Sequence, residues 1–266
     1  MLANFHTHST FCDGKNTPEE VVLAAVDQGM DSLGFSGHAY TEFDLRYCMK
    51  DTSAYVSEIK RLKEKYKGEI QIYLGVEEDA YCPAYRELFD YIIGSSHYFC
   101  VDGSYYPIDS SYDHFKKCLD LFNSDAVAMA HAYYRPFCRY INERRPDIIG
   151  HFDLITKYDE LDRPMFLENK EYNKVAEHYV SEASRSGSLF ELNTGAIARE
   201  LRSSPYPAEN LLYVLKKEGS GLILSSDSHR SDTLCFGFGE ARKYLKDIGF
   251  TFVYTLYNGE FVKDCL

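Results

Sequence analysis

Short apolar runs alternate with longer amphipathic segments along most of the chain. Runs of this length suit buried β-strands, whereas a helix needs a longer apolar pattern. The sequence therefore predicts strands at residues 2–5, 32–35, 70–76, 91–94, 148–150, 188–192, 221–224 and 252–256.

The segments between these runs carry the signals of amphipathic helices. Thr17 precedes Pro18 and two glutamates, which is typical of a helix N-terminus, and Gly29 marks the end of that helix. Apolar residues recur at helical spacing from Tyr55 to Tyr66. Further helices are expected near residues 111–143, 171–186, 207–218 and 239–247.

Alternating strands and helices predict an α/β fold in which crossover helices join parallel strands. Seven or eight such units fit a closed or distorted β/α barrel better than an open sheet. Linkers rich in Pro, Gly or Ser, charge blocks and internal repeats are all missing from the sequence, so residues 1–266 are expected to form a single domain. In a barrel of this kind the active site lies at the carboxyl ends of the strands.

The composition limits which kinds of partner the protein can bind and in which cellular compartment it is expected. The 29 Lys and Arg residues face 41 Asp and Glu residues, and this net charge of −12 argues against nucleic-acid binding. A small anionic substrate stays compatible with it, because bound metal ions or a few cations can hold a phosphate. The sequence shows neither an apolar run that could cross a membrane nor a signal peptide. The eight scattered cysteines are therefore expected to be free thiols, which predicts a cytoplasmic protein.

Histidines and carboxylates follow nearly every predicted strand. They converge on one rim if the strands are parallel. The residues at these positions are His6, His8, His38, Glu77, His97, His151, Glu191, Asn193, Asp227 and His229.

This pattern predicts a centre with several metal ions. In His6-Thr7-His8 both imidazoles lie on one face of a strand, because side chains alternate with a period of two. Imidazole suits Zn, Mn or Fe, and carboxylates can bridge ions. Such a centre lowers the pKa of water and binds phosphoryl oxygens. The alternative for any single histidine is an ordinary hydrogen-bonded residue, and we expect this for His114 and His178 on the surface. His131 is expected in the core or beside the ligands rather than among them.

The motifs at the strand ends resemble those of the polymerase and histidinol phosphatase (PHP) superfamily. They are His6-Thr7-His8-Ser9 with Asp13-Gly14, Ser36-Gly37-His38, Gly75-Val76-Glu77, Gly94-Ser95-Ser96-His97, Gly150-His151-Phe152-Asp153 and Ser226-Asp227-Ser228-His229. The resemblance spans about residues 5 to 250. The long segment between His97 and His151, and the segment 191–194, resemble the stand-alone histidinol-phosphate phosphatases of this superfamily.

The resemblance implies a distorted (β/α)7 barrel that holds three divalent metal ions, which are Zn, Mn or Fe. By motif, the first ion is held by His6, His8, Glu77 and Asp227. Glu77 bridges to the second ion, held by His97 and His151. The third ion is held by Asp13, His38 and His229, with Asp13 standing where some members have His. Glu78 would point to the opposite face of its strand.

The implied reaction is hydrolysis of L-histidinol phosphate to L-histidinol and phosphate, a step of histidine biosynthesis. Asp153 and His229 are the candidates for the general acid. The candidates for substrate binding are Lys157, Arg199, Arg202 and Asn193, and the alternative for the three cations is a solvated surface position.

Two further questions stay open at this point. The aromatic residues between His97 and His151 (Tyr105, Tyr106, Tyr133, Tyr134, Phe137 and Tyr140) either form a lid over the substrate or pack helices and a homodimer surface. The alternative functions are a PHP phosphoesterase with another substrate, such as a nucleotide, and a metal-binding module without activity. All nine expected ligand positions are filled, which disfavours the inactive module.

Overall fold

The computed structural model of the protein describes residues 1–162 and 164–266. Its main sheet has nine strands in the order β1-β2-β3-β4-β7-β8-β9-β10-β11. The first seven in this order pair in parallel: β1 (Ala3–Asn4), β2 (Ser32–Phe35), β3 (Gln71–Asp79), β4 (Tyr91–Ser95), β7 (Ile148–Ile149), β8 (Leu189–Asn193) and β9 (Leu222–Ser225). The predicted α/β fold with a central parallel sheet is confirmed.

A backbone bridge joins the two ends of this row of seven strands. Thr7, which follows β1, forms a parallel bridge with Ser228, which follows β9. The amide of His8 donates to the Ser228 carbonyl at 2.8 Å, and the Ser228 amide donates to the His6 carbonyl at 3.0 Å. The row therefore curls into a distorted seven-stranded barrel whose carboxyl ends form one continuous rim.

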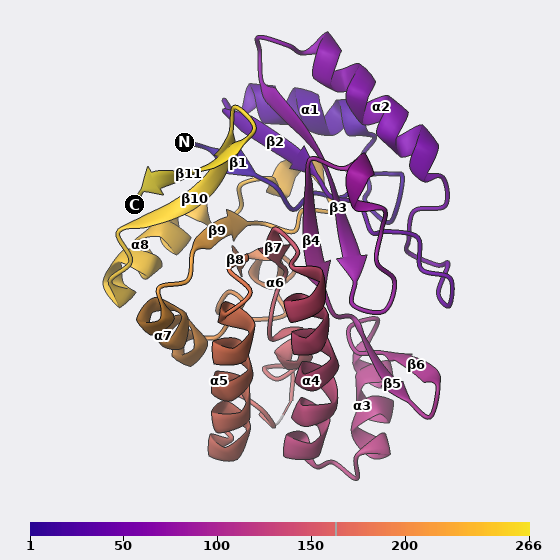
Figure 1. The fold of residues 1–266 in the computed structure, drawn as a ribbon, viewed down its shortest axis with the longest axis vertical. Helices are drawn as coiled ribbons and strands as arrows, with labels where there is room; N and C mark the ends of the chain where they lie inside the picture. Colours follow the sequence, from indigo (N-terminus) through magenta and orange to yellow (C-terminus); the bar gives the residue numbers. More distant parts are fainter. Residues whose placement is uncertain (163) are drawn as a thin grey trace.

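Helices cover the outside of the strands (Figure 1). The longer ones are α1 (Pro18–Asp27), α2 (Thr52–Lys65), α4 (Ala126–Arg144), α5 (Lys170–Ser184), α7 (Glu209–Glu218) and α8 (Phe238–Ile248). The predicted start of α1 is a capping box, in which the Thr17 side chain accepts from the Glu20 amide and the Glu20 carboxylate accepts from the Thr17 amide. The barrel interior is filled by a separate apolar cluster that includes Phe5, Tyr91 and Ile148.

Three expectations about elements need correction. The single helix expected at residues 111–143 is two helices, α3 (Tyr112–Leu121) and α4, because Asn123 and Ser124 adopt left-handed backbone conformations with φ of 51° and 59°. A hairpin of β5 (Tyr98–Val101) and β6 (Ser104–Pro107) follows β4 and was not predicted. The last expected strand, β10 (Phe252–Tyr257), turns back into an antiparallel partner, β11 (Glu260–Cys265).

The β10–β11 hairpin lies at the amino ends of the barrel strands, opposite the rim. Ser32 at the start of β2 donates to the Leu256 carbonyl at 3.2 Å, and Gln71 at the start of β3 donates to Asn258 at 2.8 Å. Both chain termini lie beside this hairpin (Figure 1). The described part of the chain contains no helix with the length and apolarity that a membrane span requires.

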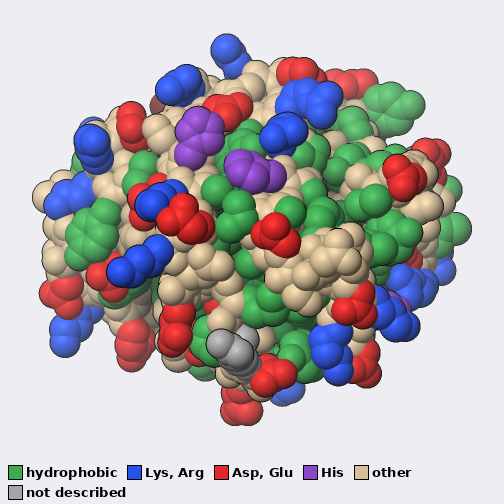
Figure 2. Space-filling view, turned by 90° about the horizontal axis from the view of Figure 1, so that it is seen from below, with side chains coloured by type: hydrophobic (Ala, Val, Ile, Leu, Met, Phe, Trp, Pro, Cys, Tyr) green, Lys and Arg blue, Asp and Glu red, His purple; other side chains and the backbone are tan. Residues whose placement is uncertain are grey.

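Charged side chains of both signs are spread over the surface. On the face shown in Figure 2, acidic and basic side chains lie scattered around an area rich in apolar side chains. The net charge of −12 is therefore not gathered into one acidic block on this face.

Candidate metal centre

The rim of the barrel brings all nine predicted ligand residues together. They come from the ends of six strands and from the turn after β1. Four overlapping groups have ligand atoms within 4.8 Å of one another: His8, Asp13, His38 and His229; His6, Glu77 and His151; His6, His8 and Asp227; and His38, Glu77 and His97. Parallel strands thus place imidazoles and carboxylates that are more than 200 residues apart at one point.

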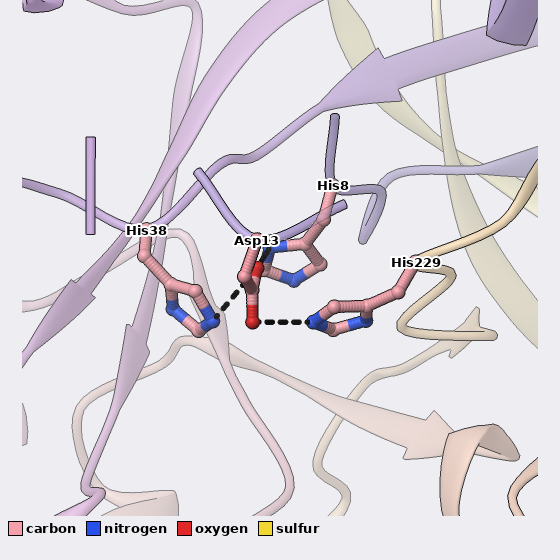
Figure 3. Close-up of side chains that lie close together, drawn as sticks. All are labelled: His8, Asp13, His38 and His229. Atoms are coloured by element: carbon pink, nitrogen blue, oxygen red, sulfur yellow. Dashed lines mark ion pairs between the residues drawn. The ribbon is translucent and has the colours of Figure 1, made fainter. Parts of the chain in front are cut away.

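The outermost group is built around Asp13, which lies between three imidazoles (Figure 3). One oxygen of Asp13 is 3.2 Å from Nε2 of His229, and the other is 3.6 Å from Nδ1 of His8 and 3.8 Å from Nε2 of His38. Gly14 makes this turn possible, because a Cβ there would lie 2.4 Å from the Ser9 amide nitrogen. The side chain of Asp13 is one-third exposed, so this group opens toward solvent.

Glu77 lies at the centre of the remaining groups. One of its oxygens is 2.9 Å from Nδ1 of His38 and 3.2 Å from Nε2 of His6. The other is 3.0 Å from Nε2 of His151 and 3.4 Å from Nε2 of His97. Each oxygen therefore faces a different pair of imidazoles, which is the arrangement that a carboxylate bridging two ions requires.

Unpartnered buried atoms show that the cluster fits divalent metal ions. Nε2 of His6, Nε2 of His8, one oxygen of Asp13 and one of Glu77 are buried without a hydrogen-bond partner. Buried polar groups without a partner are costly, and a bound cation satisfies lone pairs of this kind. Imidazole and carboxylate donors together suit Zn, Mn or Fe.

Burial and charge together set the protonation of the cluster. Burial lowers the pKa of His6, but neighbouring carboxylates, Glu191 first, outweigh it and hold the pKa well above its usual value. Burial raises the pKa of Glu77, but the histidines around it, His6 first, hold that pKa well below its usual value. Burial and the neighbouring His229 lower the pKa of His8 to about 3. The central carboxylate is therefore ionised and the His8 imidazole is neutral, as metal ligands must be.

A cavity of about 760 Å³ lies over the cluster. This volume suits a small molecule. Six of the expected ligands line it, together with five cationic and two further acidic side chains: Asp13, His38, His97, His151, Asp227, His229, Lys15, Arg46, Lys157, Arg199, Arg230, Asp44 and Asp109.

Two of the predicted substrate-binding cations line this cavity. Arg199 donates to an oxygen of Asp227 at 2.8 Å, and its side chain is one-third exposed. The Lys157 ammonium donates to the backbone carbonyl and to the carboxylate of Asp109, at 3.0 and 3.2 Å. Both side chains are thus held beside the cluster with part of their charge facing the cavity.

Three other predicted residues lie away from the cavity wall. Asp153 is fully buried, accepts from the Ala208 amide at 3.0 Å and lies 3.8 Å from Arg202. Arg202 is itself buried, donates to Thr156 and stacks over a tyrosine ring. Asn193 is buried and donates to Glu191 at 2.8 Å. The turn after His151 directs Asp153 into the core. None of the three side chains lines the cavity, so their positions do not favour the predicted contacts with substrate.

The geometry also separates the two roles expected of His229. Nδ1 of His229 lies 3.0 Å from the backbone carbonyl of Asp227, which accepts the ring N–H. Nε2 then faces Asp13 inside the outermost group. This arrangement favours the role of metal ligand over that of general acid.

The aromatic residues of the segment between His97 and His151 divide into two sets. Tyr133, Tyr134, Phe137 and Tyr140 of α4 are buried in the main core, as the packing alternative predicts. Tyr105 on β6 instead stacks on Phe43 with ring centroids 3.8 Å apart. Of the other histidines, His131 pairs with Tyr179, His114 lies beside serine hydroxyls, and His178 is exposed.

Sequence reasoning did not assign three residues that the structure places at the centre. Asp109 and Tyr47 line the cavity. Asp109 follows β6 of the hairpin that was not predicted, and Tyr47 lies in an irregular segment without a strand signal. Glu191 was noted at a strand end without a role. It lies beneath the cluster, with an oxygen 2.9 Å from Nδ1 of His6.

Comparison with known families places this centre in a defined class. Residues 4–195 match the family model described as PHP domain. The chain therefore belongs to the PHP domain family.

Individual relatives narrow the comparison further. The chain is 28% identical over 274 residues to a Schizosaccharomyces pombe protein named "Probable histidinol-phosphatase", covering 94% of this chain and 88% of the relative. It is 23% identical to the histidinol-phosphatase of Bacillus subtilis, covering 88% of this chain and 95% of that one.

Solved structures support the same fold. The histidinol phosphate phosphatase of Lactococcus lactis, solved with zinc, L-histidinol and phosphate, has a TM-score of 0.74 at 20% identity and covers 98% of this chain and 99% of its own. A structure from Listeria monocytogenes has a TM-score of 0.78 at 21% identity, covering 90% and 99%. At these identities the likeness establishes the fold.

Proposed function

We propose that the protein is a metal-dependent phosphomonoesterase that hydrolyses L-histidinol phosphate to L-histidinol and phosphate. One observation carries the proposal: nine imidazole and carboxylate side chains meet at the floor of a cavity large enough for a small molecule. Membership of the PHP domain family and the names of the relatives supply the substrate.

Three groups of residues would hold the metal ions. By the family motifs they are His6, His8, Glu77 and Asp227; Glu77, His97 and His151; and Asp13, His38 and His229. All nine residues belong to the four overlapping groups at the rim. Divalent ions in such a centre stabilise the charge that develops on a phosphoryl group and lower the pKa of water.

Arg199 would bind the phosphate. Its guanidinium lies against Asp227 and 3.4 Å from His229, so it stands at the edge of the ligand cluster. Guanidinium groups bind phosphate oxygens through charge-assisted hydrogen bonds. Arg230 lines the same cavity and adds positive charge there.

Asp109 would bind the cationic part of the substrate. It lines the same cavity as Arg199, and its nearest charged neighbours are Lys157 and His97. Burial raises the pKa of Asp109, but Lys157 and His97 outweigh it and lower this pKa below its usual value. An ionised carboxylate and a guanidinium on the wall of one cavity suit a substrate that carries a cationic amine and a phosphate.

The remaining expectations are proposals of the same kind. We expect residues 1–266 to act as one catalytic domain, in the cytoplasm, without a nucleic-acid partner. A homodimer would be compatible with this arrangement.

Phosphate release tests the proposal directly. The protein is loaded with Mn²⁺ or Zn²⁺ and assayed with L-histidinol phosphate, beside a chelated sample. A kcat/KM above about 10⁴ M⁻¹s⁻¹ that chelation abolishes is the expected result. Cleavage of an aryl phosphate but not of L-histidinol phosphate would contradict the proposed substrate and support the phosphatase activity. Cleavage of neither substrate would contradict the proposal that the protein is a phosphatase.

A further inference from the structure

In the described part of the chain, β8 is the strand of the parallel row that supplies no residue to the four ligand groups. The other six strands of the parallel row each lead into a residue of the four clusters, whereas β8 leads into none. It instead places Glu191 beneath them, with a side chain that is fully buried. This carboxylate belongs to the centre without facing the cavity.

Glu191 fixes the orientation of the His6 ring. Its oxygens are 2.9 and 3.2 Å from Nδ1 of His6, so they accept the N–H of that nitrogen. The opposite nitrogen, Nε2, is 3.2 Å from Glu77 and 3.6 Å from Asp227. With Nδ1 bonded to Glu191, Nε2 is the nitrogen that faces the cluster, and a metal ion bound there would replace its proton.

The same carboxylate holds a second ligand residue. The backbone amide of His151 donates to Oε1 of Glu191 at 2.6 Å. His151 and His6 belong to one cluster with Glu77, although they come from β7 and β1. The side-chain amide of Asn193 donates to the same oxygen at 2.8 Å and fixes the carboxylate. Glu191 thus connects the two strands that carry His6 and His151, both of which face the shared carboxylate Glu77.

We propose that Glu191 is a positioning residue that strengthens metal binding at the cluster of His6, Glu77 and His151. The inference rests on the metal centre of the proposed function. The negative charge of the carboxylate makes His6 a stronger donor, and its hydrogen bonds hold His6 and His151 in register. Loss of such a partner costs about 10- to 100-fold in metal affinity.

Glu191→Gln is the sharpest test. The variant keeps the size of the side chain but removes its charge. It also replaces one acceptor oxygen with an NH₂ donor. Because three donors converge on Glu191, at least one of their hydrogen bonds is lost. We expect about 10- to 100-fold weaker binding of one Zn²⁺ ion, measured by competition with a chromophoric chelator. The ion expected at Asp13, His38 and His229 should keep its affinity, because none of these side chains bonds to Glu191.

Asp159→Asn is the matched control. Asp159 is also a buried carboxylate with three donors, the backbone amides of residues 165, 166 and 167. It contacts no ligand residue among its described hydrogen bonds. We expect this variant to be less stable to urea but to bind Zn²⁺ as the wild-type protein does.

The outcomes separate the inference from the proposed function. If Glu191→Gln binds every ion with wild-type affinity, or loses no more affinity than Asp159→Asn, the positioning role is wrong. If the wild-type protein itself binds no metal ion, the proposed function is wrong, and the role of Glu191 is wrong with it. If Glu191→Gln does not fold, Asn193→Ala replaces it. That variant removes one donor to the carboxylate, and wild-type affinity in it would overturn the inference.

Discussion

Two imidazoles of the rim, His97 and His229, have a different partner at each ring nitrogen. Nδ1 of His97 lies 3.3 Å from Asp79, while its Nε2 lies 3.4 Å from Glu77. His229 has its Nδ1 against a backbone carbonyl of its own loop and its Nε2 against Asp13. In both of these rings Nδ1 is held by a residue outside the expected ligands or by the backbone, and Nε2 faces the ligand cluster, where a metal ion would bind.

At the residue scale, Arg199→Ala tests the phosphate contact. The substitution removes a charge-assisted hydrogen bond of about 1.5–3 kcal/mol, so we expect KM for the phosphomonoester to rise tenfold or more. Steady-state kinetics measures this, and metal content is determined in parallel because Arg199 also bonds to Asp227. Arg61→Ala, which removes an exposed guanidinium on α2, should leave KM unchanged. An unchanged KM in Arg199→Ala would contradict the contact.

Asp109→Asn tests recognition of the substrate amine. Loss of this carboxylate should raise KM for L-histidinol phosphate about tenfold or more and leave KM for an uncharged aryl phosphate nearly unchanged. The two substrates are compared on one metal-loaded preparation. An equal rise for both would mean that Asp109 acts by holding Lys157 instead.

The ligand residues were predictable because they obey two simple rules. Side chains alternate along a strand, and parallel strands end on one rim. Asp153 and Arg202 follow no such rule, since their directions depend on turns whose course the sequence does not reveal. Glu191 lies on a strand and points inward, but the alternation alone does not distinguish a ligand from a residue one layer below.

At the scale of elements, β3 is held from both faces. Glu77 points into the barrel, while the next residue, Glu78, points outward as predicted and is fully buried. Glu78 accepts from Tyr140 at 2.6 Å and from Arg144 at 2.8 and 3.0 Å, both on α4. This contact ties the strand that carries the central carboxylate to the longest helix.

Arg144→Met should destabilise the fold while sparing the chemistry. The change leaves the buried charge of Glu78 without its main partner. Because Arg144 is one-quarter exposed, we expect a loss of about 2–3 kcal/mol, below the full cost of breaking a buried pair. Urea unfolding of the metal-free protein measures it. Arg139→Met, an exposed position on the same helix, should change stability by less than about 0.5 kcal/mol. Equal values for the two variants would refute the role of this pair.

The elements that sequence reasoning missed were both hairpins. Asp102-Gly103 and Asn258-Gly259 occupy their turns, with positive φ at all four residues. Such pairs are strong hairpin signals. The strands of the first hairpin, β5 and β6, are only four residues long each, and their mixed residues give a weak strand signal. The eight core strands and most helices were predictable, since their periodicity reflects burial against one core.

At the scale of the whole molecule, metal binding should add to stability. Ions that bind only the folded chain stabilise it by about 4 kcal/mol each at a thousandfold excess over Kd. For a chain of this size, that corresponds to a rise in Tm of roughly 10 °C per ion. Thermal unfolding with saturating Zn²⁺ and with chelator measures the difference. Identical transitions would contradict a metal centre built from the rim residues.

The bridge between Thr7 and Ser228 has a consequence for synthesis of the protein. The rim closes only when residues near both ends of the chain meet. A growing chain exposes His6 and His8 early, but their partners Asp227 and His229 emerge some 220 residues later. On the ribosome the first strand lacks its partner at the far end of the row, because contacts so distant in sequence form late. The full set of nine ligands can therefore assemble only after the last strand of the parallel row has been synthesised.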